Sequence, residues 1–382
     1  MKLVKKILAV TLASAMVLSL AACGGSQSKT EVTGNETSGA ETKAGADSTA
    51  KKDKLKVKVC LSTFSDNSFS QSLYEGAVKL KEESSDTVDV EPVEIGTDDT
   101  VWVDAFYEAA DAGYDVIVGT GYQNAETFAN LPKEYPDIKW ILFDQPLDFS
   151  AGDLPNVLSV LFNSSQSGYL SGAAAAYYSK TGTIAFVGGK DSIVVNEFLV
   201  GYIEGAKSVR SDIKVLTAYN GSYTDTANAK SITEAQIAEG ADVVFQCAGG
   251  SGNGVLEAAA EADGVMSIGV DADQSVTLAG SGYEKAVMTS ALKNLGNAFI
   301  NIINQYAADE NSVPFGSEIT YGLEIDGVGI VYNDQLTAAI GEENVKKLKD
   351  IQSQLADGSI TSSTAASMST DDISALIKSA AE

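Results

Sequence analysis

The sequence predicts an α/β protein with two lobes, each built on a doubly wound parallel sheet. Short apolar runs alternate with amphipathic stretches of helical spacing from Leu55 onward, a pattern typical of parallel sheets with helices on both faces. The alternation breaks off near residue 162 and then restarts, which divides the chain into runs of about 110 and 130 residues. A length of 382 residues is consistent with two such lobes.

The first run contains the elements of one lobe. Strands are expected where apolar residues cluster between turns, and helices where apolar residues recur every three or four positions, as Leu73, Ala77 and Leu80 do. We expect strands at 57–61, 88–95, 114–119 and 138–144, an extended segment at 157–162, and helices at 70–83, 102–112 and 125–135.

The second run repeats this alternation and ends in a polar tail, 346–382, which looks helical and is expected to pack on the second lobe. The first lobe is therefore expected to comprise 55–162 with about 292–315, and the second 163–291 with about 316–382. We expect strands at 183–187, 214–219, 242–247, 266–270 and 287–291, helices at 169–178, 195–208, 226–239, 254–263 and 295–306, and an extended segment at 318–332.

Composition excludes several classes of function. The chain has 26 Lys and Arg against 52 Asp and Glu, a net charge of −26 that disfavours nucleic-acid binding. It has no His, which removes histidine-based catalysis and imidazole metal sites. Its 3 Cys form no CxxC pair and no disulfide framework, and Cys60 and Cys247 are expected as buried free thiols. We expect neither a metal nor a cofactor.

The N-terminus has the features of a bacterial sorting signal. Three lysines precede an apolar run, 7–20, that is too short for a permanent membrane span. The run ends in Leu-Ala-Ala-Cys, which resembles a lipobox, whose cysteine sulfur receives a diacylglycerol before cleavage. We therefore expect a lipoprotein signal peptide at 1–22 and a lipid on Cys23, the alternative being an ordinary secretory peptide with an incidental cysteine. The polar, glycine-rich stretch that follows, 23–54, is expected to be a flexible tether.

The loops that follow the strands are the candidate binding loops. In open α/β sheets ligands bind beyond the carboxyl ends of the strands, and two facing lobes place these loops on either side of a cleft. The loops are 62–69, 119–122, 144–145, 188–194, 220–225, 248–254, 271–274 and 292–294.

Two loops of the first run carry side chains suited to ligand binding. Asp66 or Ser68 is expected either to cap the first helix or to bind a ligand. Phe69, at the start of that helix, is poorly placed for the core and is a candidate for stacking. Asp144 is the first polar residue after the apolar strand, and it is expected either to point into the cleft or to cap a neighbouring element.

The second run offers a glycine-rich turn, two acids and a lysine. The turn 249–254 matches no phosphate-binding spacing and contains no basic residue, so a neutral hydroxyl-bearing ligand fits better than a phosphate. Asp271 and Asp273 follow a strand, and such a pair can hold sugar hydroxyls, bind Ca²⁺ or catalyse glycoside cleavage, although no DxDxDG-type loop is present. Lys293 lies where the chain is expected to cross between the lobes, as either a ligand contact or a paired charge.

These segments, in their order and spacing, resemble the basic membrane protein family of lipoproteins. The family comprises purine-nucleoside-binding substrate-binding proteins of ABC importers with a type I periplasmic-binding-protein fold. The chain departs from the family pattern at Ser70, where Asn is common, and at Gln166, where Glu is common. The resemblance covers about 57–331 and rests on 66–71 with Gly76, 169–172 with Ala174 and Ala175, Gly188 and Gly189 with Phe198, Gly201 and Gly205, 219–225 with Lys230, 248–254 with 268–274, and Ser290 with Lys293.

The resemblance implies how a purine base would be held. Phe69 and Tyr223 would stack on its two faces, with Phe198 as the alternative to Tyr223. Asp144 would accept hydrogen bonds from base N–H groups. One of the residues 66–68 would contact a neighbouring edge of the base.

The resemblance also implies how the ribose would be held. Asp271 would accept hydrogen bonds from the ribose hydroxyls and Lys293 would donate to them. Gly249 and Gly250 would let the backbone approach the sugar.

We therefore expect a binding protein and not an enzyme. Anchored by its lipid on the extracytoplasmic face of a bacterial cell membrane, it would close two lobes around a purine nucleoside through three interlobe crossings. It would deliver the nucleoside, as a monomer, to the permease and ATPase subunits of an ABC importer. The long tether suits a Gram-positive surface. The alternatives are a sugar or other small metabolite as the ligand, a surface receptor or adhesin, and a hydrolase or transferase with Asp144 and Asp271 as an acid pair.

Overall fold

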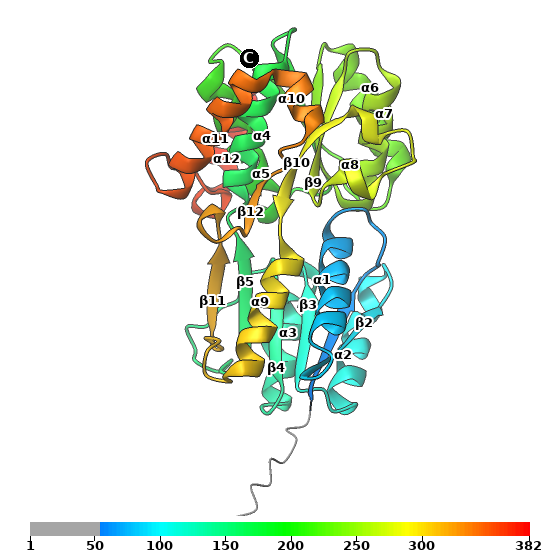
Figure 1. The fold of residues 1–382 in the computed structure, drawn as a ribbon, viewed down its shortest axis with the longest axis vertical. Helices are drawn as coiled ribbons and strands as arrows, with labels where there is room; N and C mark the ends of the chain where they lie inside the picture. The colour runs from blue at the N-terminus through cyan, green and yellow to red at the C-terminus, as the bar shows by residue number, and fades with distance from the viewer. Residues whose placement is uncertain (1–53) are drawn as a thin grey trace, which may run out of the picture. The chain divides into compact units, whose positions relative to one another are not determined.

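Two six-stranded sheets, one in each lobe, organise residues 54–382, which the computed structural model describes (Figure 1). All strand pairs but one are parallel and helices cover both faces of each sheet, which confirms the predicted fold class. The described residues pack as one unit. The expected signal peptide, Cys23 and nearly all of the expected tether lie outside them. Within 54–382, no helix is long and apolar enough to cross a membrane.

The first lobe consists of β1 (Leu55–Leu61), α1 (Phe69–Glu83), β2 (Val88–Glu94), α2 (Trp102–Asp111), β3 (Val116–Thr120), α3 (Ala125–Glu134), β4 (Lys139–Phe143), β5 (Val157–Phe162), α9 (Leu295–Ala308) and β11 (Ser317–Tyr321). The strand order is β11-β5-β4-β3-β1-β2. The central strands β3 and β4 are nearly continuous apolar runs because helices bury both of their faces. Helices α1 and α9 cover one face, and α2 and α3 pack on the other around Phe106, Phe128 and Trp140.

The second lobe consists of α4 (Ser164–Tyr178), β6 (Thr183–Gly188), α5 (Ile193–Val209), β7 (Lys214–Tyr219), α6 (Thr226–Ala238), β8 (Val243–Cys247), α7 (Gly252–Glu261), β9 (Met266–Asp271), α8 (Gln274–Thr277), β10 (Val287–Lys293), β12 (Val328–Ile330), α10 (Asp334–Ile340), α11 (Glu342–Ala356) and α12 (Thr370–Ala381). The strand order is β12-β10-β9-β8-β6-β7. Helices α4 and α5 pack against Phe186 and Phe245 on one face, and α6 and α7 cover Val187 and Val244 on the other.

Short 3-10 turns complete both lobes. Several of them follow strands directly and therefore carry residues at the carboxyl ends of the sheets. They are η1 (Asp99–Val101), η2 (Tyr122–Asn124), η3 (Gly249–Ser251), η4 (Glu284–Ala286), η5 (Leu323–Ile325) and η6 (Ala365–Ser367).

The chain crosses between the lobes three times, after β5, after β10 and after β11. The third crossing corrects two expectations, namely that 318–332 is one extended segment and that residues from about 316 belong to the second lobe. Strand β11 pairs in parallel with β5 in the first sheet, whereas β12 pairs antiparallel with β10 in the second. Gly322 and Asp326, the latter with a φ of 55°, form the turn that separates the two strands.

Helices α4 and α5 pack through glycines. In α4, 12 of the 15 residues are buried, so the helix has no amphipathic stripe, and it begins at Ser164 rather than at the expected residue 169. Gly168 and Gly172 lie against the backbone of α5, and Gly201 and Gly205 lie against the backbone of α4. A side chain at any of these positions would overlap a carbonyl oxygen of the facing helix.

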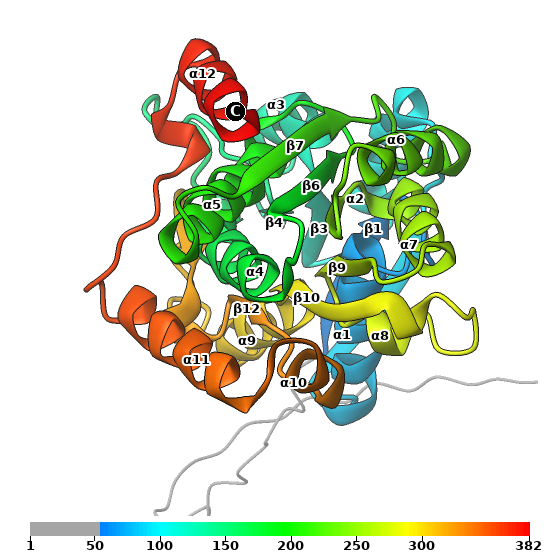
Figure 2. The same ribbon diagram turned by 90° about the horizontal axis from the view of Figure 1, so that it is seen from above.

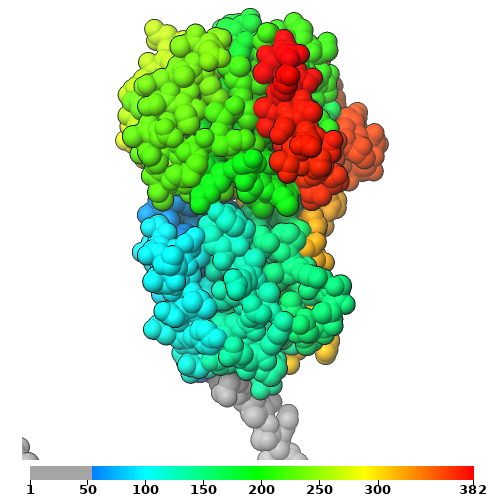
Figure 3. All heavy atoms as spheres, turned by 180° about the vertical axis from the view of Figure 1, so that it is seen from behind, coloured from blue at the N-terminus to red at the C-terminus, as the bar shows by residue number. Residues whose placement is uncertain are grey.

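The C-terminal tail packs on the second lobe, as expected. Helix α12 lies alongside β7 and on the outer surface of this lobe (Figures 2 and 3). Val200, Ala365 and Ile373 form a small apolar cluster beneath it. The backbone N–H of Ala366 donates to Glu197 of α5 at 2.9 Å. The tail is thus part of the folded lobe. Cys60 and Cys247 are buried free thiols, as predicted.

We expect Gly172→Ala to lower the free energy of unfolding by about 1–3 kcal/mol, the usual cost of overpacking a core. The methyl group would meet the backbone of Tyr202, and this clash outweighs the better helix propensity of alanine. Urea unfolding followed by circular dichroism measures the change. Gly329→Ala is the matched control, because Gly329 is buried but has open space where a Cβ would lie. Equal losses for the two variants would contradict this account of the helix pair.

Candidate functional site

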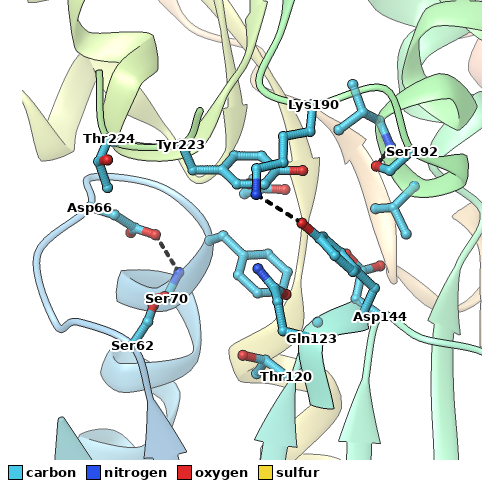
Figure 4. Close-up of a pocket in the computed structure, with 18 of the residues that line it drawn as sticks. Ser62, Asp66, Ser70, Thr120, Gln123, Asp144, Lys190, Ser192, Tyr223 and Thr224 are labelled. Carbon is cyan, nitrogen blue, oxygen red and sulfur yellow. Dashed lines mark hydrogen bonds between the residues drawn. The ribbon is translucent and has the colours of Figure 1, made fainter. Parts of the chain in front are cut away.

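A cavity of about 520 Å³ lies where the carboxyl ends of the strands of the two lobes meet (Figure 4). Its lining comes from the segments after β1, β2, β3 and β4 of the first lobe and after β6, β7 and β8 of the second, together with the ends of β9 and β10. This is the edge at which open parallel sheets bind ligands, and small-molecule sites usually measure about 300–1,000 Å³.

The cavity brings together nine of the ten candidate binding residues. The exception is Ser68, which corrects the expectation that it faces the ligand. Its side chain is fully buried at the N-cap of α1, behind the lining, and its hydroxyl has no hydrogen-bond partner within the described part of the chain. The nine that line the cavity are Asp66, Phe69, Asp144, Phe198, Tyr223, Gly249, Gly250, Asp271 and Lys293.

Three acidic or amide residues in the loops that follow β1, β4 and β9 or at the end of these strands have a left-handed backbone. Their φ values are 61° for Asn67, 66° for Asp144 and 65° for Asp271. Asn and Asp tolerate this region better than other residues with a Cβ. Asp144 directly follows β4 and Asp271 ends β9, so each sharp turn starts where an apolar strand stops. Backbone outliers of this kind cluster at binding sites.

A buried lysine joins the two lobes within the cavity lining. Lys293, the last residue of β10, is 1% exposed. Its Nζ lies 2.7 Å from Oδ2 of Asp144 in the first lobe and 3.9 Å from Oδ1 of Asp271 in the second. Both carboxylates are themselves buried. The three side chains form an ion cluster that neither lobe could complete alone.

Burial and charge act in opposite directions on this cluster. Burial disfavours the charge on Lys293, but Asp144 and Asp271 outweigh it and raise the pKa of the ammonium above its ordinary value. Burial raises the pKa of Asp271 to about 7, which Lys293 opposes and Asp144 reinforces. Oδ1 of Asp271 has no well-formed hydrogen bond to any described residue, although the buried hydroxyl of Ser68 lies near enough to lower the pKa of this carboxyl. A buried carboxylate oxygen near its titration point therefore lies at the cavity without a well-formed hydrogen bond to any described residue.

Asp66 already has partners in the protein. One of its carboxylate oxygens accepts from the backbone N–H groups of Ser68 (3.0 Å) and Gln71 (3.1 Å), and the other accepts from that of Ser70 (2.9 Å) (Figure 4). These are free amides of the first turn of α1, so Asp66 performs the capping role that the sequence offered as one alternative.

Aromatic rings line the cavity from both lobes. Phe69 of the first lobe and Tyr223 of the second are half-buried. Phe198 is almost fully buried, and it packs edge-on against Phe245 with ring centroids 6.0 Å apart. The Nζ of Lys293 lies 5.0 Å from the ring centroid of Phe198 and 5.5 Å from that of Phe69. Phe198 is thus a wall of the ion cluster, whereas Phe69 and Tyr223 retain accessible ring surface.

The glycines of the turn after β8 support Tyr223. Gly249 has a φ of 54°, and a side chain there or at Gly250 would approach the ring or the backbone of Tyr223. Gly189 faces the same ring so closely that any side chain would overlap it. Small residues on these two loops therefore set the position of the tyrosine.

Sequence reasoning missed several lining residues. Tyr122 and Gln123 follow β3, Lys190 follows β6, and Trp102 begins α2. The Nζ of Lys190 donates to the hydroxyl of Tyr122 at 3.2 Å, a contact between the two lobes (Figure 4). Position alone could have found Lys190 and Tyr122, since both lie in loops that follow strands.

The first binding loop is fixed to the second lobe by its backbone. The carbonyl of Asn67 accepts from the side chains of Gln274 and Thr277, each at 3.1 Å. The side-chain amide of Asn67 donates to Asn253 at 3.4 Å. The loop that carries Phe69 is therefore held across the cleft in this arrangement.

The acid pair considered for catalysis is arranged for binding. Asp144 and Asp271 both face the ammonium of Lys293, which joins the two carboxylates in one ion cluster. Within 54–382, no cluster of three or more acidic or cysteine side chains is placed to hold a metal ion.

This fold and cleft define a two-lobed solute-binding protein. Residues 55–362 match the family model described as ABC transporter substrate-binding protein PnrA-like. The chain is 34% identical to the ABC transporter nucleoside-binding protein BmpA of Lactococcus lactis subsp. cremoris over 78% of its own length and 85% of that protein. It is 32% identical to basic membrane protein A of Borreliella burgdorferi over 75% and 81%.

A solved structure agrees with this assignment at the level of the fold. The crystal structure of an ABC transporter system solute-binding protein from Aeropyrum pernix K1 is similar with a TM-score of 0.72 and 22% identity, over 86% of this chain and 99% of that one. The chain belongs to the PnrA-like family of ABC transporter substrate-binding proteins. The members of this family bind solutes and are not enzymes, and an ABC transporter is their partner.

We expect Lys293→Met to lower the free energy of unfolding by about 3–5 kcal/mol, because it leaves two buried carboxylates without a cation. The loss is smaller at acidic pH, where Asp271, its pKa raised further by removal of the lysine, is protonated and uncharged. Urea unfolding at acidic and at mildly alkaline pH measures both effects. Lys214→Met, at an exposed lysine of β7, is the control. A Lys293→Met protein as stable as this control would contradict the structural role of the cluster.

Proposed function

We propose that this chain is the nucleoside-binding component of an ABC importer and that its ligands are purine nucleosides. The observation that carries the proposal is the combination of two accessible aromatic rings from opposite lobes with a buried carboxylate oxygen that has no well-formed hydrogen bond to a described residue, all lining one cavity. A nucleoside offers the matching parts, a flat base and a ribose with two adjacent hydroxyls. The name of the Lactococcus lactis relative, a nucleoside-binding protein, supports the same ligand class.

In this proposal the base lies between Phe69 and Tyr223. Stacking on aromatic side chains is worth about 1–3 kcal/mol per base. One oxygen of Asp144 is engaged by Lys293, and the other accepts from an N–H group of the base. Phe198 contributes a buried wall rather than a stacking face.

The ribose lies at the ion cluster. Its hydroxyls donate to Oδ1 of Asp271, which has no well-formed hydrogen bond to a described residue, and accept from Lys293, an ammonium with three N–H groups. The cluster contains two carboxylates and one ammonium, so a neutral ligand suits it better than an anion. The backbone at Gly249 and Gly250 borders the same region of the cavity.

Binding closes the two lobes about their three connections. Asp144 and Phe69 belong to the first lobe, and Asp271, Lys293 and Tyr223 to the second, so a ligand that contacts both sets stabilises the closed arrangement. The closed form is what the permease and its ATPase subunits would receive.

We further propose that the protein is a monomer held on the extracytoplasmic face of the cell membrane by a lipid on Cys23. The Leu-Ala-Ala-Cys motif after the apolar run supports the anchor. Two or more acyl chains give stable attachment where one does not. Metabolic labelling with a fatty-acid analogue, lost in Cys23→Ala, tests this part of the proposal.

A thermal-shift panel tests the ligand class. Residues 54–382, unfolded and refolded to remove any carried ligand, are heated with adenosine, guanosine, inosine, cytidine, uridine, ribose or galactose. A ligand at about 100 times its Kd adds roughly 2.7 kcal/mol of stability, which is easily measured. We expect stabilisation by the purine nucleosides, and its loss in Phe69→Ala and Asp271→Ala. Stabilisation by free sugars alone would refute the proposal in favour of a sugar-binding protein.

We expect nucleoside affinity to increase as the pH rises through about 7. Asp271, with its pKa raised to about 7, is partly protonated in the free protein at neutral pH. Ribose hydroxyls that donate to it favour the ionised form and lower its pKa in the complex, so binding releases a proton and is weaker in acid. Titration calorimetry in buffers of different ionisation enthalpy counts this proton. An affinity independent of pH from about 6 to 8, with no proton released, would exclude Asp271 as the ribose acceptor.

A further inference from the structure

One cationic side chain in the cavity lining lacks an ionic partner. Of the residues that the structure describes, two lysines and no arginine line the cavity. Lys293 is held by Asp144 and Asp271, whereas none of the ion pairs among residues 54–382 involves Lys190. The cavity lining thus contains one ammonium with no carboxylate partner among the described residues, in a chain with twice as many acidic as basic residues.

The contacts of Lys190 are neutral and leave donors free. Its Nζ donates to the hydroxyl of Tyr122 and lies 5.8 Å from the ring centroid of Tyr223 and 6.0 Å from that of Tyr122. The side chain extends into the cavity from the loop after β6, beside the ring of Tyr223 (Figure 4). An ammonium has three N–H donors and no acceptor, and the tyrosine hydroxyl occupies one of them.

We propose that Lys190 is a specificity-determining residue that donates to acceptor atoms on the base and thereby selects 6-oxopurine nucleosides, such as inosine and guanosine, over adenosine. The inference rests on the proposed function and deepens it. A base that stacks on Tyr223 lies next to the ammonium, whose flexible four-carbon stem lets it reach the edge of the base.

The chemistry of the purine edges gives the direction of the preference. A 6-oxopurine presents O6 and N7 as neighbouring acceptors, and a lysine pairs well with both. Adenine replaces O6 with an amino group, a donor that opposes the donor-only ammonium. Asp144 acts in the same sense, because a carboxylate accepts from the N1–H that a 6-oxopurine has and adenine lacks. Lys293 does not take over the role of Lys190, since its ammonium lies between Asp144 and Asp271, in the ion cluster at which the ribose is placed.

Titration calorimetry on residues 54–382 with inosine, guanosine and adenosine tests the proposal. We expect the wild-type protein to bind inosine and guanosine more tightly than adenosine. Lys190→Met keeps the apolar stem and removes the donor, so its affinity for the two 6-oxopurine nucleosides falls by about tenfold or more while its affinity for adenosine changes little. Lys214→Met removes the same charge at an exposed site of β7 away from the cavity and serves as the control.

Tyr122→Phe separates base recognition from lobe bridging. This variant removes the hydroxyl that Lys190 contacts in the first lobe and leaves the ammonium in place, so the ratio of inosine to adenosine affinity is expected to persist. If Lys190→Met and Tyr122→Phe weakened all three nucleosides equally, the lysine would act as a bridge between the lobes and the proposal would be overturned.

Failure of this inference can be distinguished from failure of the proposed function. If Lys190→Met bound nucleosides with an unchanged ratio of inosine to adenosine affinity, this inference would be overturned and the proposed function would stand. If the wild-type protein bound no nucleoside, both would be refuted. Tighter binding of guanosine 5′-monophosphate than of guanosine, lost in Lys190→Met, would show that the lysine recognises a phosphate and would overturn the assignment to the base.

Discussion

The arrangement of the two lobes depends on one buried cation. Lys293 ends β10 two residues before α9 begins, so the second sheet fixes its position just where the chain crosses to the first lobe. Asp271 approaches it from the neighbouring strand of the same sheet, and Asp144 comes from the other lobe. An unpaired buried ammonium costs several kcal/mol, and Lys293 has both of its carboxylate partners, Asp144 and Asp271, only when the two lobes are together. The pair of Lys293 with Asp144 therefore favours the arrangement in which the two lobes are together.

The same cluster limits the chemistry of the ligand. Lys293 and Asp144 are engaged with each other, and the atom left without a well-formed hydrogen bond to a described residue is an acceptor, Oδ1 of Asp271. Asp66 contributes no comparable acceptor, because three backbone amides of α1 occupy its carboxylate. A ligand that fills the cavity has to supply hydrogen-bond donors at this point, and a further negative charge beside two carboxylates would be repelled. Neutral, hydroxyl-bearing molecules meet both conditions.

The strands of both sheets and several residues of the cavity could be predicted from the sequence, because local patterns of apolar and polar residues encode them. Apolar runs identified the parallel strands, and the polar residues that end them, Asp144 and Asp271, proved to line the cavity. Features that depend on packing between distant segments could not be found in this way. Strands β11 and β12 lie close together in the sequence and have only the short 3-10 turn η5 between them, so nothing local assigns them to different sheets. Helix α4 is buried on all sides and lacks an amphipathic period, which hid its first turn.

The contact between Lys190 and Tyr122 could not be predicted for a related reason. The sequence places both residues in candidate binding loops, but nothing local indicates that these two loops, which belong to different lobes, meet. The two lysines of the cavity lining therefore differ in their surroundings. A change at Lys293 alters the buried charge balance of the whole molecule, whereas Lys190 lies on a loop and contacts neutral groups. Both lysines belong to the second lobe and meet their first-lobe partners when the lobes approach. On the proposal made above, a substitution at Lys190 changes ligand preference through the loop after β6 and leaves the buried pairs of Lys293 with Asp144 and Asp271 in place.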